Sequence, residues 1–108
     1  MVNSRAKGKR GELEISKILK EHGYEDARRG QQYSGFNGDA DVVGLPGYHI
    51  EVKRVENLNL DKAMDQSMRD AKEGEVPIVA HRKNGKEWKV TLHLEDFINL
   101  LIKSQGRK

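Results

Sequence analysis

A chain of 108 residues has room for one modest hydrophobic core and too little for two. Hydrophobic residues make up 35% of the chain, charged residues 34%, and the formal net charge is +3, so we expect a small core beneath a heavily charged surface. The absence of cysteine excludes disulfides and zinc–thiolate sites, and no apolar run has the length of a membrane span or the form of a signal peptide. We therefore expect a single cytoplasmic domain over residues 1–108.

The first half of the chain predicts one helix followed by three short strands. Apolar residues recur at helical spacing over residues 7–21, and Gly23 then provides a helix stop. Residues 25–29 form a weak strand candidate, whereas residues 30–38 are rich in glycine and polar side chains, as in a loop. The segment 41–53 indicates two short strands joined by a Gly/Pro turn.

The second half predicts two helices and a β-hairpin. Residues 60–72 have helical apolar spacing, and the strands 77–81 and 88–93 flank the hairpin signal Asn84-Gly85. Residues 94–102 form an amphipathic helix with acids at its start, where the helix dipole favours them. The order α-β-β-β-α-β-β-α predicts an α/β or α+β fold, in which helices flank a mixed central sheet.

Three charged side chains on two of these strands form the main candidate site. Asp41 opens the first strand, and period-two alternation puts Glu51 and Lys53 on one face of the second, opposite Ile50 and Val52. Charges also alternate on exposed strands, so a surface role is the alternative. The apolar neighbours indicate central strands instead, where a charge needs compensation. Carboxylates suit a cation such as Mg²⁺, and the adjacent ammonium suits a phosphate.

Other acids and one histidine lie near this candidate site. Glu12 falls at the edge of the buried face of the first helix and can point into a cleft beside the sheet; a first-turn acid favoured by the helix dipole is the alternative. Glu14 lies further round the helix, and we expect it to be solvated. Asp39 shares the face of Asp41 but belongs to the loop, so Asp41 is the better ligand. The histidines lack metal-ligand spacing, although His49 shares the face of the second-strand charges.

Basic residues gather at the start of the chain and after the first helix. Such clusters suit a polyanion, while an ordinary disordered tail is the alternative for the first residues, and we expect residues 1–6 to form a flexible basic arm. The loop aromatics Tyr33 and Phe36 can stack on exposed bases or fold back onto the core. The candidate nucleic-acid contacts are Arg5, Lys7, Lys9, Arg10, Arg28, Arg29, Gln31, Gln32 and Tyr33.

The order of the acids resembles the PD-(D/E)xK nuclease superfamily, with Glu12 on a helix, Asp41 on a strand and Glu51-Val-Lys53 on the next. Ala40 stands where the superfamily commonly has a proline. The resemblance implies a restriction-endonuclease-like core and a metal-dependent endodeoxyribonuclease that uses Mg²⁺, or Mn²⁺, and no organic cofactor. It implies that Asp41, Glu51, the Val52 carbonyl and Glu12 bind the metal, and that Lys53 is the catalytic lysine.

Three segments are similar to archaeal-type Holliday junction resolvases and related small phage nucleases: residues 7–14, 28–30 and 50–53. This narrower resemblance implies a homodimer that cuts four-way DNA junctions to 5′-phosphate and 3′-hydroxyl ends, in the cytoplasm of a prokaryotic host. It also implies that Ser34 assists catalysis and that Gln66 is a polar residue near the lysine.

Two other functions stay open at this point. A nuclease of the virus-type replication-repair class would act on flaps, nicks or ends, and Leu58, Leu60 and Gln66 partly match its pattern. A catalytically silent DNA-binding module of the same fold would keep the basic residues and use the acids only for structure.

Overall fold

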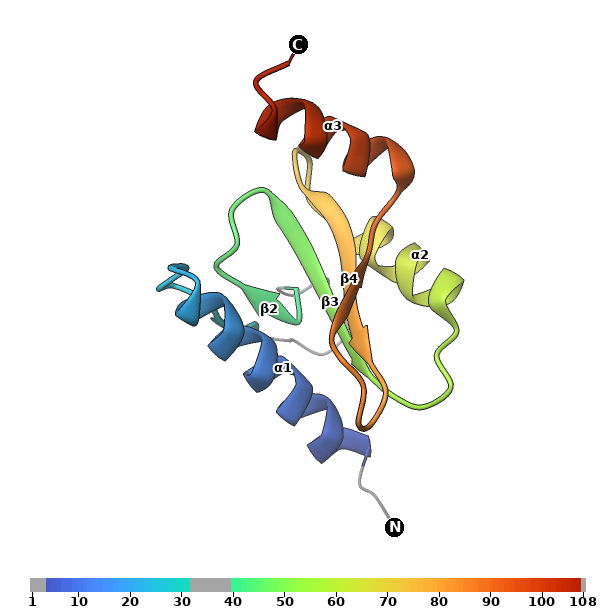
Figure 1. Ribbon diagram of the computed structural model, residues 1–108. Coiled ribbons are helices and arrows are strands. Elements are labelled where there is room, and N and C mark those ends of the chain that lie inside the picture. The colour runs from blue at the N-terminus through green and yellow to red at the C-terminus, as the bar shows by residue number, and fades with distance from the viewer. Residues whose placement is uncertain (1–3, 32–39, 108) are drawn as a thin grey trace.

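The fold is an α+β arrangement of three helices and five strands within residues 4–31 and 40–107, the part of the chain that the structure describes (Figure 1). The structure is a computed structural model. Its order of elements confirms the predicted α-β-β-β-α-β-β-α. In chain order the elements are α1 (Ser4–Glu21), β1 (Arg28–Arg29), β2 (Val42–Val43), β3 (Tyr48–Arg54), α2 (Leu60–Asp70), β4 (Val76–Arg82), β5 (Lys89–Thr91) and α3 (Leu94–Ser104).

The five strands form one mixed sheet in the order β1-β2-β3-β4-β5. β3 and β4 run parallel because α2 is the crossover between them, and the other neighbouring strands pair antiparallel. β3 is the middle strand, and it pairs with β4 over its whole length, from Tyr48↔Val76 to Arg54↔Arg82. The strand that carries Glu51 and Lys53 is therefore central, as predicted.

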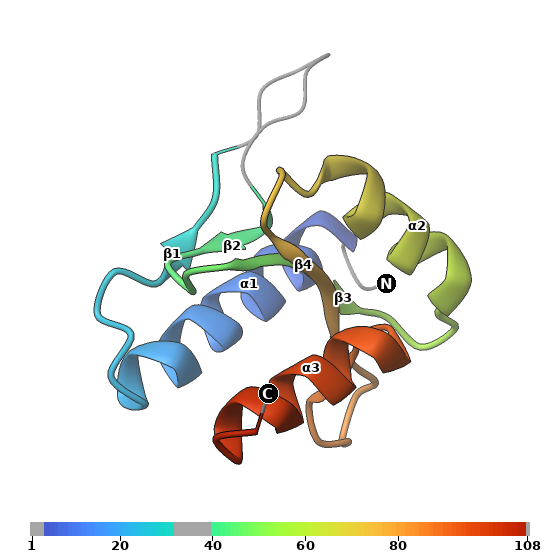
Figure 2. The same ribbon diagram turned by 90° about the horizontal axis from the view of Figure 1, so that it is seen from above.

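Alternation along β3 and β4 sends side chains to helical layers on the two sides of the sheet (Figure 2). Ile50 and Val52 pack with Ile15 of α1 in the larger core cluster. On the other face, Val79 packs against Met64 of α2 in a smaller cluster. Glu51 and Lys53 of β3 consequently lie on the face that the larger core does not use.

Two polar side chains fix the position of α2. Asn59 caps its N-terminus, because the Asn59 side chain accepts a hydrogen bond from the Lys62 N–H at 3.0 Å. The Ser67 side chain is fully buried and donates from its Oγ to the Ile78 carbonyl at 3.0 Å. These bonds set the rotation of α2 and therefore which of its polar residues face the sheet.

Several element boundaries differ from those predicted. α1 begins at Ser4, so residues 4–6 are helical rather than part of a flexible arm. The strand candidate 25–29 is reduced to the two residues of β1, because residues 24–27 form a turn in which the Ala27 N–H donates to the Tyr24 carbonyl at 3.1 Å.

α3 departs most from the expected arrangement of helices packed on the sheet. It has no buried residue, and all of its large apolar side chains except Ile102 are exposed. Within residues 4–31 and 40–107, no helix has both the length and the apolar character that a bilayer crossing requires.

The turn between β2 and β3 depends on a glycine at Gly44. Its φ of +101° is in the left-handed region, and a Cβ atom there would lie 2.5 Å from the Ala27 Cα. We expect Gly44→Ala to lower the free energy of unfolding by more than about 1 kcal/mol, because both the backbone angle and the space forbid the side chain. Gly47→Ala is the matched control, since Gly47 has a φ of +85° but no heavy atom within 4 Å of the added Cβ. Denaturant unfolding should rank Gly44→Ala as the less stable variant, and equal losses would contradict the packing argument.

Candidate active site

One cleft of about 290 Å³ collects the charged residues that the sequence singled out. β3 contributes Glu51 and Lys53 to its lining, and Asp41 comes from the residue directly before β2. The two flanking helices contribute Glu12 from α1 and Gln66 from α2. The structure thus brings together residues from four separate segments of the chain.

Asp41 is held in place by backbone hydrogen bonds on the central strand. β2 pairs with β3 at Val42↔Ile50, and the Asp41 N–H donates to the Ile50 carbonyl at 3.0 Å. The Asp41 Oδ2 accepts a hydrogen bond from the Val52 N–H at 2.8 Å. The backbone pairing of β2 with β3 is at Ile50, so the Val52 N–H bonds to the Asp41 side chain instead. This bond fixes the side chain in the cleft.

Asp41 and Glu51 form a buried pair of carboxyls. Burial first and the nearby Glu51 carboxylate second raise the pKa of Asp41 to about 7, against the opposing effect of the bond from the Val52 N–H. A hydrogen bond joins the two carboxyls, so Asp41 is the member that holds the proton. Near neutral pH the cleft can lose this proton, and a cation would stabilise the resulting pair of negative charges.

His49 is the second partner of Glu51. Its Nε2 lies 2.9 Å from the Glu51 Oε1, and both side chains are buried. Burial acts to raise the pKa of Glu51, but the hydrogen bonds from His49 and Asp41 and the nearby Lys53 outweigh it and lower the pKa overall. Burial acts to lower the pKa of His49, but the bond to Glu51 outweighs it and raises the pKa overall. Glu51 is therefore ionised and oriented by His49, a role that the sequence left open.

His49 also belongs to a second group of metal-ligand types. The ligand atoms of His49, Glu51 and Asp70 lie within 4.8 Å of one another among the described residues. Glu51 is common to this group and to the cleft. Asp70 comes from the end of α2, so sequence spacing alone does not reveal the group.

Glu12 reaches the cleft because α1 passes close to β3. A Cβ atom on Gly11 would lie 3.2 Å from the Arg54 Cβ, so the glycine permits this approach. The Glu12 Oε1 accepts a hydrogen bond from the Arg29 Nε at 2.9 Å, and the Glu12 side chain is 17% exposed. The alternative of a first-turn acid is wrong, because α1 begins at Ser4 and has no acid in its first turn.

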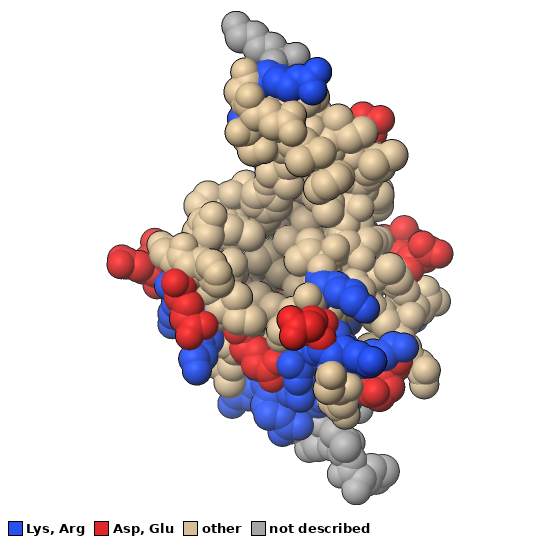
Figure 3. Space-filling view, in the orientation of Figure 1, with Lys and Arg blue, Asp and Glu red and all other residues tan. Residues whose placement is uncertain are grey.

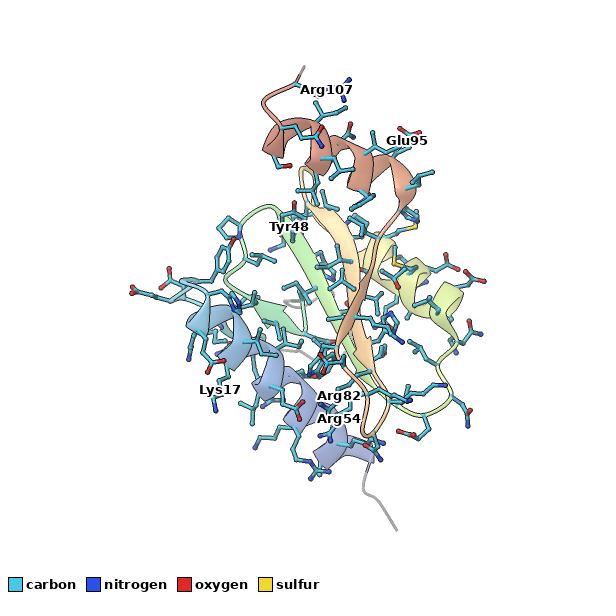
Figure 4. All side chains as sticks on the ribbon, viewed as in Figure 1. Lys17, Tyr48, Arg54, Arg82, Glu95 and Arg107 are labelled. Atoms are coloured by element: carbon cyan, nitrogen blue, oxygen red, sulfur yellow. The ribbon has the colours of Figure 1, made fainter. Side chains whose placement is uncertain are left out.

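The expectation that Glu14 is solvated is also wrong. Its Oε2 accepts from the Arg54 Nη1 at 2.9 Å, and its Oε1 accepts from the Trp88 Nε1 at 3.1 Å. Arg82 lies 3.6 Å from the same carboxylate and stacks over the Trp88 ring, near Arg54 (Figure 4). Trp88 is half-buried and also packs against the larger core cluster. The cluster ties α1 to β3 and β4 next to the cleft.

The predicted nucleic-acid contacts differ in their surroundings. Lys9, Arg10, Arg28 and Gln31 are exposed, whereas the Lys7 ammonium bonds to Glu56 at 3.3 Å. Arg29 is 40% exposed despite its bond in the cleft. The predictions for Gln32, Tyr33, Ser34, Phe36 and Asp39, and for the Arg5 side chain, fall outside the described residues.

A further basic groove was not identified from the sequence. It has a volume of about 710 Å³ between the β3–α2 connection and the β4–β5 hairpin, and it is lined by Lys83, Lys86 and Lys89. A smaller cavity of about 260 Å³ shares Lys53 with the cleft and Leu58 with this groove. The lysines are dispersed around the hairpin signal, which explains why no local cluster pointed to them.

Comparison with known proteins identifies one family. A family model described as "Phage putative PDDEXK endonuclease" matches residues 3–107. The chain belongs to this family. PD-(D/E)xK nucleases usually use divalent metals, and a nuclease family of this kind implies DNA as the substrate. A search of curated proteins and a search of solved structures found no match.

The donor set of the endonuclease cleft fits a hard divalent cation. Asp41 and Glu51 offer carboxylate oxygens, and Val52 and Glu12 line the same space. The raised pKa of Asp41 is independent support, because two buried carboxyls repel unless a proton or a cation lies between them. The residues present therefore fit the metal that the family usually uses.

The raised pKa of Asp41 predicts a pH-dependent stability in the metal-free endonuclease. The folded pKa of about 7 exceeds the ordinary 3.8, so the folded state binds the proton more tightly, and stability falls as pH rises from about 4 to 7. Asp41→Asn keeps the acceptor for the Val52 N–H and removes the ionisation. We expect this variant to gain stability over the native protein by on the order of 2 kcal/mol between pH 5 and pH 8.

Thermal unfolding in EDTA at both pH values measures this gain. Added Mg²⁺ should raise the unfolding temperature of the native protein and leave that of Asp41→Asn unchanged. A stability difference that does not depend on pH would contradict the burial argument.

Proposed function

We propose that this endonuclease is Mg²⁺-dependent and structure-selective, with four-way Holliday junctions as its substrate. The supporting observation is the single cleft that joins Glu12, Asp41, Glu51 and Lys53, in which burial raises the pKa of Asp41 to about 7. The similarity of residues 7–14, 28–30 and 50–53 to archaeal-type resolvases favours junctions over other DNA. Such an activity belongs to DNA recombination or repair in the cytoplasm of a prokaryotic host.

In this proposal Asp41 and Glu51 hold the metal, with the Val52 carbonyl and Glu12 as further ligands, and Mn²⁺ suits the same oxygens. When bound, the cation supplies a Lewis acid that polarises the phosphoryl oxygen and lowers the pKa of water. His49 keeps the Glu51 carboxylate oriented through its 2.9 Å contact. The bond from Arg29 orients Glu12 in the same way.

Lys53 is the proposed catalytic lysine. Its charge lies near enough to Glu51 to help lower the pKa of that acid, so the ammonium can orient an attacking water and offset the negative charge that develops on the phosphate. Attack on phosphorus breaks the bond to O3′, which leaves as a 3′-hydroxyl, while the phosphate stays on the 5′ end. Gln66 lines the cleft beside Lys53, and Ser34 is the proposed assisting serine of the loop.

The route of the DNA is proposed to follow the basic residues from both sides of the cleft. Arg28, Lys9 and Arg10 are exposed on the side of α1 and β1. On the other side, the cavity that contains Lys53 leads to the groove lined by the hairpin lysines. Contacts of this kind neutralise phosphates and depend strongly on salt.

The proposal includes a homodimer. Resolution of a four-way junction needs two symmetric cuts, and two-fold symmetry is the common way for one chain to provide two equal active sites.

The active-site assignment predicts that Lys53→Ala and Asp41→Asn abolish cleavage and leave junction binding within about threefold of the native affinity, because neither removes an exposed phosphate contact. Cleavage of four-way junction, flap, fork and linear duplex at equal concentration, with Mg²⁺ and with EDTA, measures activity and preference together. Lys17→Ala is the matched control, since Lys17 is exposed on α1 and lies apart from the cleft residue Arg54 (Figure 4).

Undiminished cutting by either variant would overturn the active-site assignment. A preference for flaps or nicks would overturn the junction assignment in favour of the replication-repair class. Binding without Mg²⁺-dependent cutting of any substrate would indicate a silent DNA-binding module.

The groove predicts a separate effect on binding. We expect Lys86→Ala to weaken binding of all DNA structures by roughly threefold to tenfold and to reduce the slope of log affinity against log salt by about 1, because one phosphate contact is lost. Fluorescence anisotropy in EDTA, at several salt concentrations, measures both quantities. An unchanged slope, equal to that of Lys17→Ala, would remove the hairpin from the DNA route.

A further inference from the structure

The basic groove beside the β4–β5 hairpin has an apolar part that its lysines do not explain. Three aliphatic side chains line it together with the hairpin lysines. Leu58 and Leu60 are half-buried, so they lie deeper than the exposed lysines, and Val55 is 39% exposed directly after β3. The backbone of duplex DNA offers mainly hydrated phosphates and sugars, which suit the lysines but not the aliphatic carbon. The lining therefore fits a ligand that has an apolar face as well as a negative charge.

The charges around the groove favour an anion. Its lining carries four cations and two acids. Glu56 is already bonded to the Lys7 ammonium at 3.3 Å, and Arg82 lies 3.6 Å from Glu14, so the three exposed lysines set the sign of the groove. The hairpin tip lies near the start of α1 (Figure 1), on the half of the molecule where Lys and Arg gather (Figure 3).

The groove is continuous with the active cleft. Val55 lines both spaces and also the cavity of about 260 Å³ that shares residues with each of them. Lys53 lines that cavity and the cleft. Val55 is two residues beyond Lys53, which is roughly 7 Å further along an extended chain. A DNA strand with a phosphate at Lys53 therefore reaches the groove with an adjacent nucleotide.

An unpaired nucleotide matches this lining. The flat faces of a free base are apolar and can lie on the leucines, while its phosphate contacts the lysines; a paired base keeps those faces stacked in the duplex. Asn57 is exposed in the groove, and Asn amides pair with the polar edges of bases. His81 adds a ring of the kind on which bases stack, and burial and the nearby Lys89 lower its pKa, so the ring is neutral. The groove volume of about 710 Å³ falls in the range of roughly 300–1,000 Å³ that holds small organic ligands.

We propose that the basic groove holds an unpaired nucleotide of the DNA strand that is cut, next to the phosphate at Lys53. The inference deepens the proposed function: it rests on the proposed active cleft for the position of the cut, and it names the feature of the substrate that is selected. Extrusion of a base costs unpairing and unstacking energy, and this cost is lowest where pairing is already interrupted, as at a branch point. The groove thus gives a physical reason for selecting DNA by structure rather than by sequence.

A duplex with a single bulged nucleotide tests the groove independently of junctions. Fluorescence anisotropy of the full chain in EDTA should show at least about tenfold tighter binding to the bulged duplex than to the same duplex fully paired, because stacking of a base on a protein contributes on this scale. Equal affinity for the two duplexes would overturn the inference in favour of a groove that holds only duplex backbone. Deoxyadenosine monophosphate that binds as tightly as the bulged duplex would overturn it in favour of a free-nucleotide site.

Two uncharged substitutions separate contacts with the base from contacts with phosphate. We expect Leu58→Ala and Asn57→Ala each to reduce the preference for the bulged duplex by about threefold to tenfold and to leave the salt slope unchanged, whereas Lys86→Ala lowers the slope for both duplexes. Leu101→Ala is the matched control, since Leu101 is exposed on α3 and lines neither the groove nor the cleft.

Folding of the variants is checked by circular dichroism melts. Leu58 packs against the smaller core cluster, so its substitution lowers stability as well; Asn57 is exposed and tests the groove without that effect. A preference for the bulged duplex that both folded variants retain in full would overturn the inference.

A fluorescent base at the branch point tests the inference on four-way junctions. 2-Aminopurine is quenched inside the base stack, so we expect binding in EDTA to raise its fluorescence at least about twofold and Leu58→Ala to reduce the rise. Asp41→Asn should keep the rise while it loses cleavage, so failure of the nuclease assignment leaves this result intact. Normal Mg²⁺-dependent cleavage without any rise on binding would overturn the groove assignment and leave the active site standing.

Discussion

Two carboxyl groups buried against each other, Glu51 on β3 and Asp41 directly before β2, are the constraint on which the site depends. Asp41 is oriented by the Val52 N–H and Glu51 by His49, so neither side chain is free to turn away from its neighbour. Burial and mutual repulsion raise the pKa of one member into the neutral range. The pair of carboxyls is unfavourable for folding unless a proton or a cation neutralises one of its charges. Local destabilisation of this kind is common at functional sites, where the surrounding structure supplies the stability.

The rest of the structure supports this pair from three sides. The parallel β3–β4 pairing makes β3 central, and α2 covers the face on which Glu51 lies. α1 approaches the sheet at Gly11 and carries Glu12 to the cleft, and the Glu14 cluster ties the same helix to β3 and β4. The membership of the chain in a phage PD-(D/E)xK endonuclease family agrees with a cleft assembled in this way. On the face that Figure 3 shows, Lys, Arg, Asp and Glu gather on the half of the molecule near the start of α1, and few of them lie on the half near α3.

The sequence predicted the order of all eight elements because the signals for them are local. Helical periodicity, strand alternation and the Asn84-Gly85 turn each depend on residues a few positions apart. The shared face of Glu51 and Lys53 follows from the geometry of one strand, and their acidic neighbour Asp41 follows from a short turn. The roles of these residues, and of Ser34 in the loop, stay predictions.

What the tertiary structure decided concerns contacts between distant segments. Glu14 was expected in solvent because a helical wheel gives only its direction, and Arg54 and Trp88 meet it from other parts of the chain. His49 orients Glu51 because both side chains are buried side by side. Lys83, Lys86 and Lys89 were not singled out because only the fold shows that they line one groove. The pattern of α3 predicted an apolar stripe but not whether the stripe would be covered. The sequence by itself therefore determined the elements and the chemical types of the site, since these depend on neighbouring residues, and only the fold determined which side chains meet, because packing joins residues that are far apart in the chain.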